Sequence, residues 1–284
     1  MTEGTKSVPA ARRVAVAVAP NGGRKTKADH PALPVTAEEL AQTAAECLEA
    51  GACMMHLHVR DRDGAHVLDP DAYRAAASRI CSSVGDRLIV QITSEAMGRY
   101  PPAEQEAAIL ATNPEAVSLS LREFAPDEGH ERDFAHFLIR LKEKRVWPQF
   151  ILNTPEEARR LAGLHKRGVI PFEAPSALYV LGRFMLVRAA APADLLPFLA
   201  PDMPRFAPWG ACAFGRREAA CVTAAALLGG HARVGFENNC LLPSGEQAQS
   251  NAELVAVVAK GLSALGYGLE SAAGLRDEIA AAAG

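Results

Sequence analysis

Three residues of metal-binding types stand out by their spacing. His56 and His58 lie one residue apart within an apolar stretch, residues 53–60, whose composition predicts a β-strand. Because side chains alternate across a strand, both imidazoles are expected on the same face. Glu237 follows a second short stretch of strand character, residues 233–236, and would present a carboxylate at the end of that strand. Two imidazoles and one carboxylate are typical of a catalytic divalent metal site, with zinc the first expectation.

Simpler explanations of these residues stay open at this level. Two histidines on an apolar strand can be ordinary core residues with satisfied hydrogen bonds. Glu237 can pair with Arg233, four residues earlier, because positions i and i+4 share a strand face. If Glu237 instead binds a metal, Arg233 would place a guanidinium beside it, where it could bind or polarise an acidic substrate.

Further polar residues fall where predicted strands end and would border the same opening. They are Asn21, Ser94, Glu95, Ser118, Ser120, Arg122, Glu123 and Asn153. Loops that follow strands tolerate polar residues without any function, so this position alone assigns no role.

The elements that must hold these residues alternate regularly along the chain. Eight stretches of strand character are predicted at 13–19, 53–60, 87–93, 116–121, 146–152, 177–181, 205–209 and 233–236. Helices are predicted after Thr36 and Thr154, each followed three residues later by a glutamate as in a capping box, and over 69–82, 102–111, 131–144, 192–199, 217–228 and 251–265. This alternation predicts an α/β protein, a (β/α)8 TIM barrel, with an open doubly wound sheet as the alternative.

A barrel would bring the candidate ligands together. The strands that carry His58 and Glu237 are the second and the eighth, and alternate strands contribute side chains to the same inward layer. Residues at the carboxyl ends of the strands meet at one mouth, where barrel enzymes bind their substrates. We therefore expect the metal site at this mouth.

Composition restricts the class of protein. The 284 residues are 49% hydrophobic and 22% charged, which suits one globular domain, expected over 12–284 after a flexible tail at 1–11. A net charge of −3 gives no basic face for nucleic acid or an anionic membrane, so a small-molecule partner is expected. The first 13 residues lack the apolar stretch of 7 to 15 residues that a secretory signal needs, and no apolar run reaches about 18 residues, so neither a signal nor a membrane span is expected. Six scattered cysteines suit reduced thiols, so a cytoplasmic location is expected.

Three segments together resemble a known family. They are Leu-Pro-Val-Thr at 33–36 with Glu39, His-Leu-His-Val-Arg-Asp at 56–61, and Arg-Val-Gly-Phe-Glu at 233–237. In these segments and over nearly its whole length the chain resembles the β-keto acid cleavage enzymes. The resemblance implies a zinc-dependent Claisen-type exchange, in which a β-keto acid and acetyl-CoA become acetoacetate and a new acyl-CoA. It also implies a homodimer or homotetramer.

The resemblance also implies roles for individual residues. His56, His58 and Glu237 would bind the metal, although another divalent ion could replace zinc. Ser94 and Ser120 would contact the substrate, and we expect Asn21 to contact it from the end of the first strand. Arg233 would be the guanidinium member of a catalytic dyad.

The chain departs from the family pattern where an acid is expected. Asn238 stands in place of the dyad's aspartate, and the fifth strand carries Gln149 rather than an acidic residue. Because an amide cannot accept a proton, the base is predicted to be Glu95, which stands with Ala96 where the family has two glycines. Glu95 could equally face solvent or pair with Arg99. A different metal-dependent lyase or hydrolase, or a non-catalytic relative that binds metal or acyl-CoA, are the alternative functions.

Overall fold

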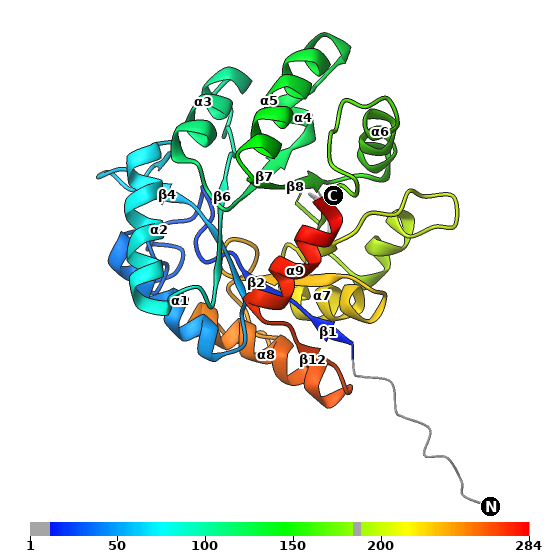
Figure 1. Ribbon diagram of the computed structural model, residues 1–284. Coiled ribbons are helices and arrows are strands. Elements are labelled where there is room, and N and C mark those ends of the chain that lie inside the picture. The colour runs from blue at the N-terminus through cyan, green and yellow to red at the C-terminus, as the bar shows by residue number, and fades with distance from the viewer. Residues whose placement is uncertain (1–11, 184–188, 284) are drawn as a thin grey trace, which may run out of the picture.

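The computed structural model describes residues 12–183 and 189–283, which form one (β/α)8 barrel. Its eight parallel strands close in the order β10-β11-β2-β3-β6-β7-β8-β9 (Figure 1). Their bounds are β2 Val16–Val18, β3 Met54–Leu57, β6 Ile89–Thr93, β7 Ala116–Ser120, β8 Trp147–Leu152, β9 Ser176–Leu181, β10 Trp209–Ala213 and β11 His231–Val234. The predicted fold is therefore confirmed, while the predicted tail at 1–11 lies outside the described residues.

Helices surround the barrel, and most of the predicted ones are present (Figure 1). They are α1 Ala37–Glu49, α2 Pro70–Val84, α3 Pro102–Thr112, α5 Glu131–Glu143, α6 Pro155–Lys166, α7 Glu218–Leu227 and α8 Asn251–Ala264. The predicted sixth helix is instead a 3-10 helix, η2 Pro192–Phe198, which contains Pro197 and so cannot keep the α-helical hydrogen-bond pattern. Two short helices that were not predicted, α4 Leu121–Phe124 and η1 Glu128–His130, follow β7.

The two predicted capping boxes have different outcomes. At α1, Thr36 accepts from the Glu39 N–H and the Glu39 side chain accepts from the Thr36 N–H, so the reciprocal box is complete. At α6, Thr154 caps the Glu157 N–H, but the Glu157 carboxylate bonds the Asn153 N–H and Arg122 instead. The helix start was right in both cases.

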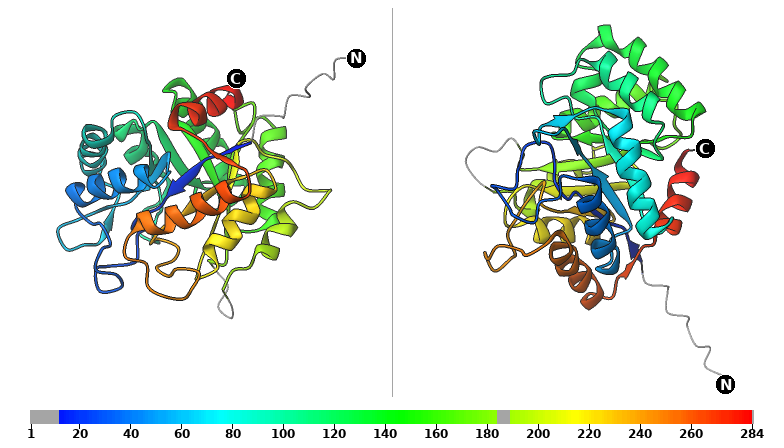
Figure 2. Two further views of the ribbon diagram at one scale, coloured as in Figure 1. Left: turned by 90° about the horizontal axis from the view of Figure 1, so that it is seen from below. Right: turned by 90° about the vertical axis from the view of Figure 1, so that its left-hand side faces the viewer.

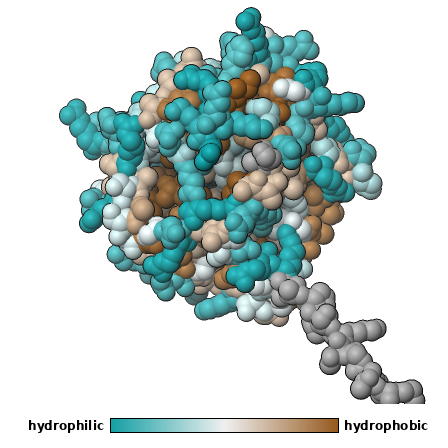
Figure 3. Space-filling view, viewed as in Figure 1, coloured by the Kyte–Doolittle hydropathy of each residue, from teal (hydrophilic) through white to brown (hydrophobic). Residues whose placement is uncertain are grey.

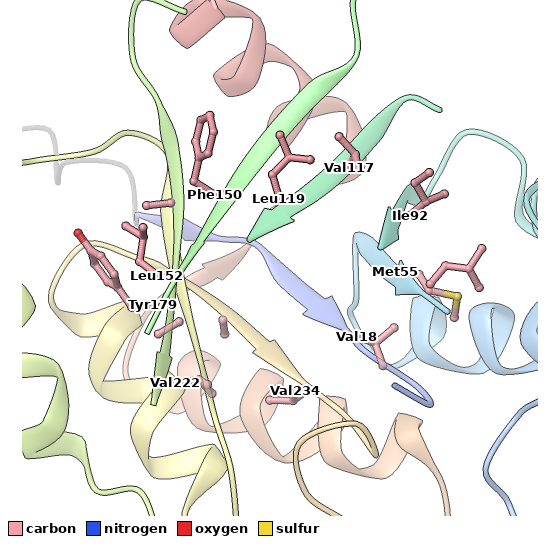
Figure 4. Packing of buried hydrophobic residues seen from close by; sticks show 14 of the residues in the cluster. Val18, Met55, Ile92, Val117, Leu119, Phe150, Leu152, Tyr179, Val222 and Val234 are labelled. Carbon is pink, nitrogen blue, oxygen red and sulfur yellow. The ribbon is translucent and has the colours of Figure 1, made fainter. Parts of the chain in front are cut away.

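The main hydrophobic core lies between the barrel and the helices. Every second strand residue points outward into it, for example Val117 and Leu119 of β7 and Phe150 and Leu152 of β8. Figure 4 shows such side chains from strands around the ring, together with Val222 of α7. This alternation leaves the other half of each strand to fill the inside of the barrel.

Two strand predictions were displaced in sequence. The seventh strand begins at Trp209 rather than 205, since Pro208 lacks the N–H that a central strand must donate. The eighth ends at Val234 rather than 236, because Gly235 turns the chain with φ +135°. A side chain at Gly235 would meet the Ala19 carbonyl oxygen at 2.4 Å. Glu237 therefore lies in the turn after β11, not on the strand.

Two other predicted strands are each divided. The first becomes β1 Arg13–Val14, which pairs with β12 Gly268–Leu269, and the barrel strand β2. The second becomes β3, inside the barrel, and β4 Val59–Arg60, which pairs antiparallel with β5 His66–Val67. His58 lies between β3 and β4.

An unpredicted helix, α9 Ala272–Ala283, closes the end of the barrel opposite the mouth (Figures 1 and 2). Ala272 and Leu275 pack against inward residues of the strands, including Ala17 and Met54. Ion pairs of Arg276 with Glu115 and of Glu278 with His231 fix its position. The surface seen from this end is mainly polar, with apolar side chains in separate patches (Figure 3).

None of the helices within the described ranges is long and apolar enough to cross a membrane.

Candidate metal centre

His56, His58 and Glu237 converge at the mouth. Their potential ligand atoms all lie within 4.8 Å of one another. Glu237 Oε2 is 3.3 Å from Nε2 of His58 and 3.7 Å from Nε2 of His56. The convergence follows from the strand order, because β3 and β11 both neighbour β2.

The three side chains fit a metal ion. His58 Nε2 and Glu237 Oε2 are both buried, face each other and have no hydrogen-bond partner among the described residues. A cation between this imidazole nitrogen and this carboxylate oxygen would satisfy both buried atoms at once. Ligand atoms around a tetrahedral zinc ion are about 3.3 Å apart, and the separation of His58 Nε2 from Glu237 Oε2 has this value. We conclude that these residues can hold such an ion.

A chain of two amides fixes the imidazole of His56. Its Nδ1 lies 2.9 Å from Oε1 of Gln91, and Gln91 Nε2 donates to Oε1 of Gln149 over 3.2 Å. Because an amide oxygen only accepts, His56 must carry its proton on Nδ1 and leave Nε2 free toward Glu237. Hydrogen bonds of this kind orient metal-ligating histidines. Gln149, on the strand that lacks the family's acid, thus supports the site indirectly.

The protonation states suit metal binding. Burial, together with the charge of Arg233, lowers the pKa of His56 to about 3, so the imidazole is neutral at physiological pH. Burial alone would raise the pKa of Glu237, but Arg233 and the two histidines outweigh it and hold that pKa well below its usual range. The neutral imidazole of His56 therefore faces an ionised carboxylate.

Arg233 lies beside this centre. One terminal nitrogen, Nη2, donates to Glu237 Oε1 over 3.0 Å. Its Nε and Nη1 are buried and have no partner among the described residues. The ion pair with Glu237 considered from the sequence is therefore present, and it occupies only part of the guanidinium. The unpartnered N–H groups remain available to a carboxylate.

The loop after β2 ties the histidine strand to its surroundings. Asn21 Nδ2 donates to the carbonyl oxygens of His58 and Pro34, both over 3.0 Å. Arg60 donates to the carbonyls of Gly22 and Lys25 in the same loop. Asn21, predicted to contact substrate, uses its amide nitrogen in this bracing, and its Oδ1 is buried without a described partner.

The same loop also holds the Glu237 turn. Lys25 Nζ donates to the carbonyl oxygen of Phe236 and lies 3.3 Å from that of Glu237. Gly22 has φ +61°, and a Cβ there would lie 2.7 Å from Glu237 Cγ, so a side chain would displace the ligand. Behind the turn, Glu218 accepts from the Gly235 N–H and Asn251 from the Phe236 N–H. Lys25 and Arg60 thereby connect both sides of the metal centre through one loop.

A cavity of about 250 Å³ opens above the centre. Of the residues predicted at the mouth, it is lined by Ser94, Glu95, Ser120, Arg122, Glu123 and Asn153. Ser94 is buried and donates to the Ser118 carbonyl oxygen, whereas the Ser118 hydroxyl is buried without a described partner. Glu95 pairs with Arg183, while Arg99 donates to the His66 carbonyl oxygen. The ion pair of Glu95 with Arg99 that was considered from the sequence is therefore not formed, and Glu95 pairs with Arg183 instead.

A second cavity, of about 520 Å³, adjoins the first and shares Arg24, Glu95, Arg183 and Glu237 with it. Asn238 lines this second cavity, and both polar atoms of its side chain are buried without a partner among the described residues. Asn21 and the glycines at 22 and 23 form another part of its wall.

Several residues of the site were missed from the sequence. They are Arg24, Lys25, Arg60, Gln91, Met97 and Arg183. Only Arg60 carried a local signal, a charged residue two positions after His58 on a buried stretch. Lys25 and Phe236 are 211 residues apart, so no spacing rule connects them.

Comparisons with known proteins agree with the geometry. A family model for beta-keto acid cleavage enzymes matches residues 13–280. The chain is 31% identical to a 3-keto-5-aminohexanoate cleavage enzyme of Fusobacterium nucleatum, over 86% of this chain and 89% of that protein. It is 27% identical to a 3-oxoadipate:acetyl-CoA acetyltransferase of Cupriavidus necator, over 86% of each.

A solved structure, the ternary complex of ObcA with a C4-CoA adduct and oxalate, has the same fold. It superposes with a TM-score of 0.66 at 18% identity, covering 88% of this chain and 68% of that one. The family match over nearly all of the described barrel, and the relative at 31% identity, lead to one conclusion. The chain belongs to the β-keto acid cleavage enzyme family.

Proposed function

We propose that this protein catalyses a metal-dependent exchange between a β-keto acid and acetyl-CoA, giving acetoacetate and a new acyl-CoA. The observation that carries the proposal is that His58 Nε2 and Glu237 Oε2 face each other, buried and without a hydrogen-bond partner among the described residues, beside the unpartnered N–H groups of Arg233. A divalent ion held by His56, His58 and Glu237, with zinc our first choice, would supply Lewis acidity to the ketone oxygen.

Arg233 binds the carboxylate of the keto acid in this proposal. Its Nε and Nη1, on either side of the Nη2 that donates to Glu237, carry N–H groups without a hydrogen-bond partner among the described residues, and either can donate to the carboxylate of the keto acid. The ion pair with Glu237 holds the guanidinium in place. Bound in this way, the keto acid has its ketone directed toward the metal ligands, while Ser94 and Ser120 border it on the cavity wall.

In the proposed reaction, Glu95 accepts the proton that leaves the α-carbon of the keto acid. Its Oε1 faces Arg183, which leaves Oε2 as the accepting atom. A methyl group placed on Gly23 would lie 3.2 Å from Glu95 Oε2 and 3.5 Å from His58 Nδ1, so the carboxylate and the imidazole border the same glycine. Asn238, adjacent to Glu237, offers only an amide, which cannot take this role.

The test is a screen of the metal-loaded protein against β-keto acids with acetyl-CoA, in which acetoacetate and new acyl-CoA are detected by mass. His58→Ala protein serves as the control, since it should give neither product. If acetyl-CoA is only hydrolysed, the alternative of a metal-dependent hydrolase holds. If metal and acetyl-CoA bind without turnover of any acid, the protein is a non-catalytic relative.

The proton acceptor is tested separately once a substrate is known. Glu95→Gln should lower kcat by about 10² to 10⁴-fold while metal content is kept. Asn238→Asp, which adds a carboxylate at the position of the family's aspartate, should restore part of the rate in the Glu95→Gln background. A normal rate for Glu95→Gln would remove Glu95 from this role.

A further inference from the structure

Three of the charged side chains that line the mouth cavity, Glu95, Arg122 and Arg183, form ion pairs within the protein. Away from the metal ligands, Glu95 forms an ion pair with Arg183, and the side chains of both are less than a quarter exposed. Arg122 donates from Nε and Nη2 to Glu157 Oε1 over 2.7 and 2.6 Å. A ligand that engages any of these charges must compete with the partner already present.

The two remaining charged side chains away from the metal ligands, Glu123 and Arg24, add little to the net charge of the cavity wall. Glu123 accepts from the Ala96 N–H over 3.1 Å, and burial raises the pKa of its carboxyl, which favours the neutral form. Arg24 is exposed at the rim and shared with the second cavity, where water screens its charge. The cavity wall away from the metal ligands therefore carries little net charge.

The positive charge lies at the deep end instead. Arg233 is buried there, and a bound divalent ion would add two further positive charges. Among the three metal ligands only Glu237 carries a negative charge to offset them. This end attracts one anionic group, the carboxylate of the keto acid. The wall of the same cavity also includes the apolar side chains of Met97, Ile151 and Val180.

We infer that the β-keto acid used by this protein carries an uncharged side chain on the ketone, one that packs on Met97, Ile151 and Val180 and leaves the Glu95–Arg183 pair intact. The inference rests on the proposed function. The named substrates of the two relatives differ here, because 3-keto-5-aminohexanoate carries an amine and 3-oxoadipate a second carboxylate. Either charge would have to break a half-buried ion pair or remain unpaired beside it.

Three acids with six-carbon chains test the inference on the metal-loaded protein. They are 3-oxohexanoate, which is neutral at the far end, 3-keto-5-aminohexanoate and 3-oxoadipate. We expect kcat/KM with acetyl-CoA to be highest for 3-oxohexanoate, by about tenfold or more, which corresponds to roughly 1.4 kcal/mol. A higher kcat/KM for either charged acid would overturn the inference.

Two variants with opposite effects on charge provide the matched test. Arg183→Met removes the cation that pairs with the Glu95 carboxylate. It should raise the ratio of kcat/KM for 3-keto-5-aminohexanoate to kcat/KM for 3-oxohexanoate about tenfold. Glu95→Gln removes the carboxylate that pairs with the Arg183 guanidinium and should raise the ratio of kcat/KM for 3-oxoadipate to kcat/KM for 3-oxohexanoate. Each ratio is taken within one variant, so a general loss of rate, including loss of a base, cancels. Unchanged ratios in both folded variants would show that the pair does not select the substrate.

Failure of the proposed function gives a different result. If none of the three acids is exchanged, that proposal is wrong, and calorimetric affinities of the acids measured without acetyl-CoA still test the inference. Tightest binding of 3-oxohexanoate would support it, and tighter binding of a charged acid would contradict it.

Discussion

The inside of the barrel has two sectors of opposite character. On β3, β6, β7, β8 and β11 the inward residues include His56, Gln91, Ser118, Gln149 and Arg233, which we call the polar sector. On β9 and β10 they include Leu178, Val180 and Cys212, which pack with Ile151 and Phe214 and which we call the apolar sector. Ser176, at the start of β9, is a buried polar exception on this side.

The outward faces show no such division, since they are apolar on both sides of the ring. The fold alone therefore does not require buried polar groups in the barrel. Each buried polar atom without a partner lowers stability, and several lie in or next to the polar sector, including the Ser118 hydroxyl and two nitrogens of Arg233. The comparison teaches that the polar sector is maintained for chemistry and the apolar sector for packing.

The largest effect should come from the metal ligands. His58→Ala removes one of three ligand atoms and should abolish nearly all metal binding and turnover, because two ligands rarely hold a divalent ion tightly. Metal content measured by mass spectrometry after dialysis checks this. His165→Gln, on α6 and bonded to the Phe172 carbonyl, is the control and should keep its metal. Full metal content in His58→Ala protein would show that His58 is not a metal ligand and that the metal centre does not lie in the polar sector.

Replacing Arg233 with lysine should have the next largest effect. A point charge cannot reproduce the paired N–H groups of the guanidinium, so kcat/KM should fall by about 10²-fold with metal still bound. Steady-state kinetics and metal content together check the expectation. Unchanged kinetics would instead assign Arg233 a purely structural ion pair with Glu237.

A smaller effect is expected from Lys25, which holds the Glu237 turn from outside the barrel. Lys25→Met should weaken metal affinity by about 10 to 100-fold, as is usual when a partner of a ligand is lost. Competition with a chelator measures this affinity. Lys27→Met is the matched control, because Lys27 is exposed and pairs only with Glu39 among the described residues. Equal affinities in the two variants would show that the loop does not position Glu237.

The smallest effect on the metal centre should come from the apolar sector. Leu178→Ala leaves a cavity beside Cys212 and Val180 and should lower the free energy of unfolding by about 2 to 5 kcal/mol. Denaturant unfolding measures the loss, and metal content of the folded variant should not change. Loss of metal from that folded variant would mean that the two sectors are coupled, contrary to the comparison.

The repeated strand and helix pattern was enough to predict the barrel. In β7, for example, the alternation of Val117 and Leu119 with serines shows directly which face is buried in the outer core. The limits of strands were less accurate where a single residue decides them. Gly235 and Pro208 end or delay a strand through backbone properties that an apolar pattern does not reveal.

The metal centre was predictable for a related reason. A spacing of two residues on one strand is a local property, so His56 and His58 could be paired from the sequence. The bracing of the same site could not, because Arg60, Gln91 and Lys25 act through contacts between distant segments. Arg183 was missed because it follows the end of the sixth predicted strand and pairs with Glu95, 88 residues earlier, so no local spacing connects the two.

Helix α9 has a practical consequence for anyone who attaches this protein to a surface or a label. It packs against the end of the barrel opposite the mouth, anchored through Arg276 and Glu278 (Figure 2). A dye or linker coupled to the exposed side of this helix would be separated from the metal centre by the full depth of the barrel. Immobilised through α9, the protein would present its mouth to the bulk solution, where ligand exchange can be followed without obstruction.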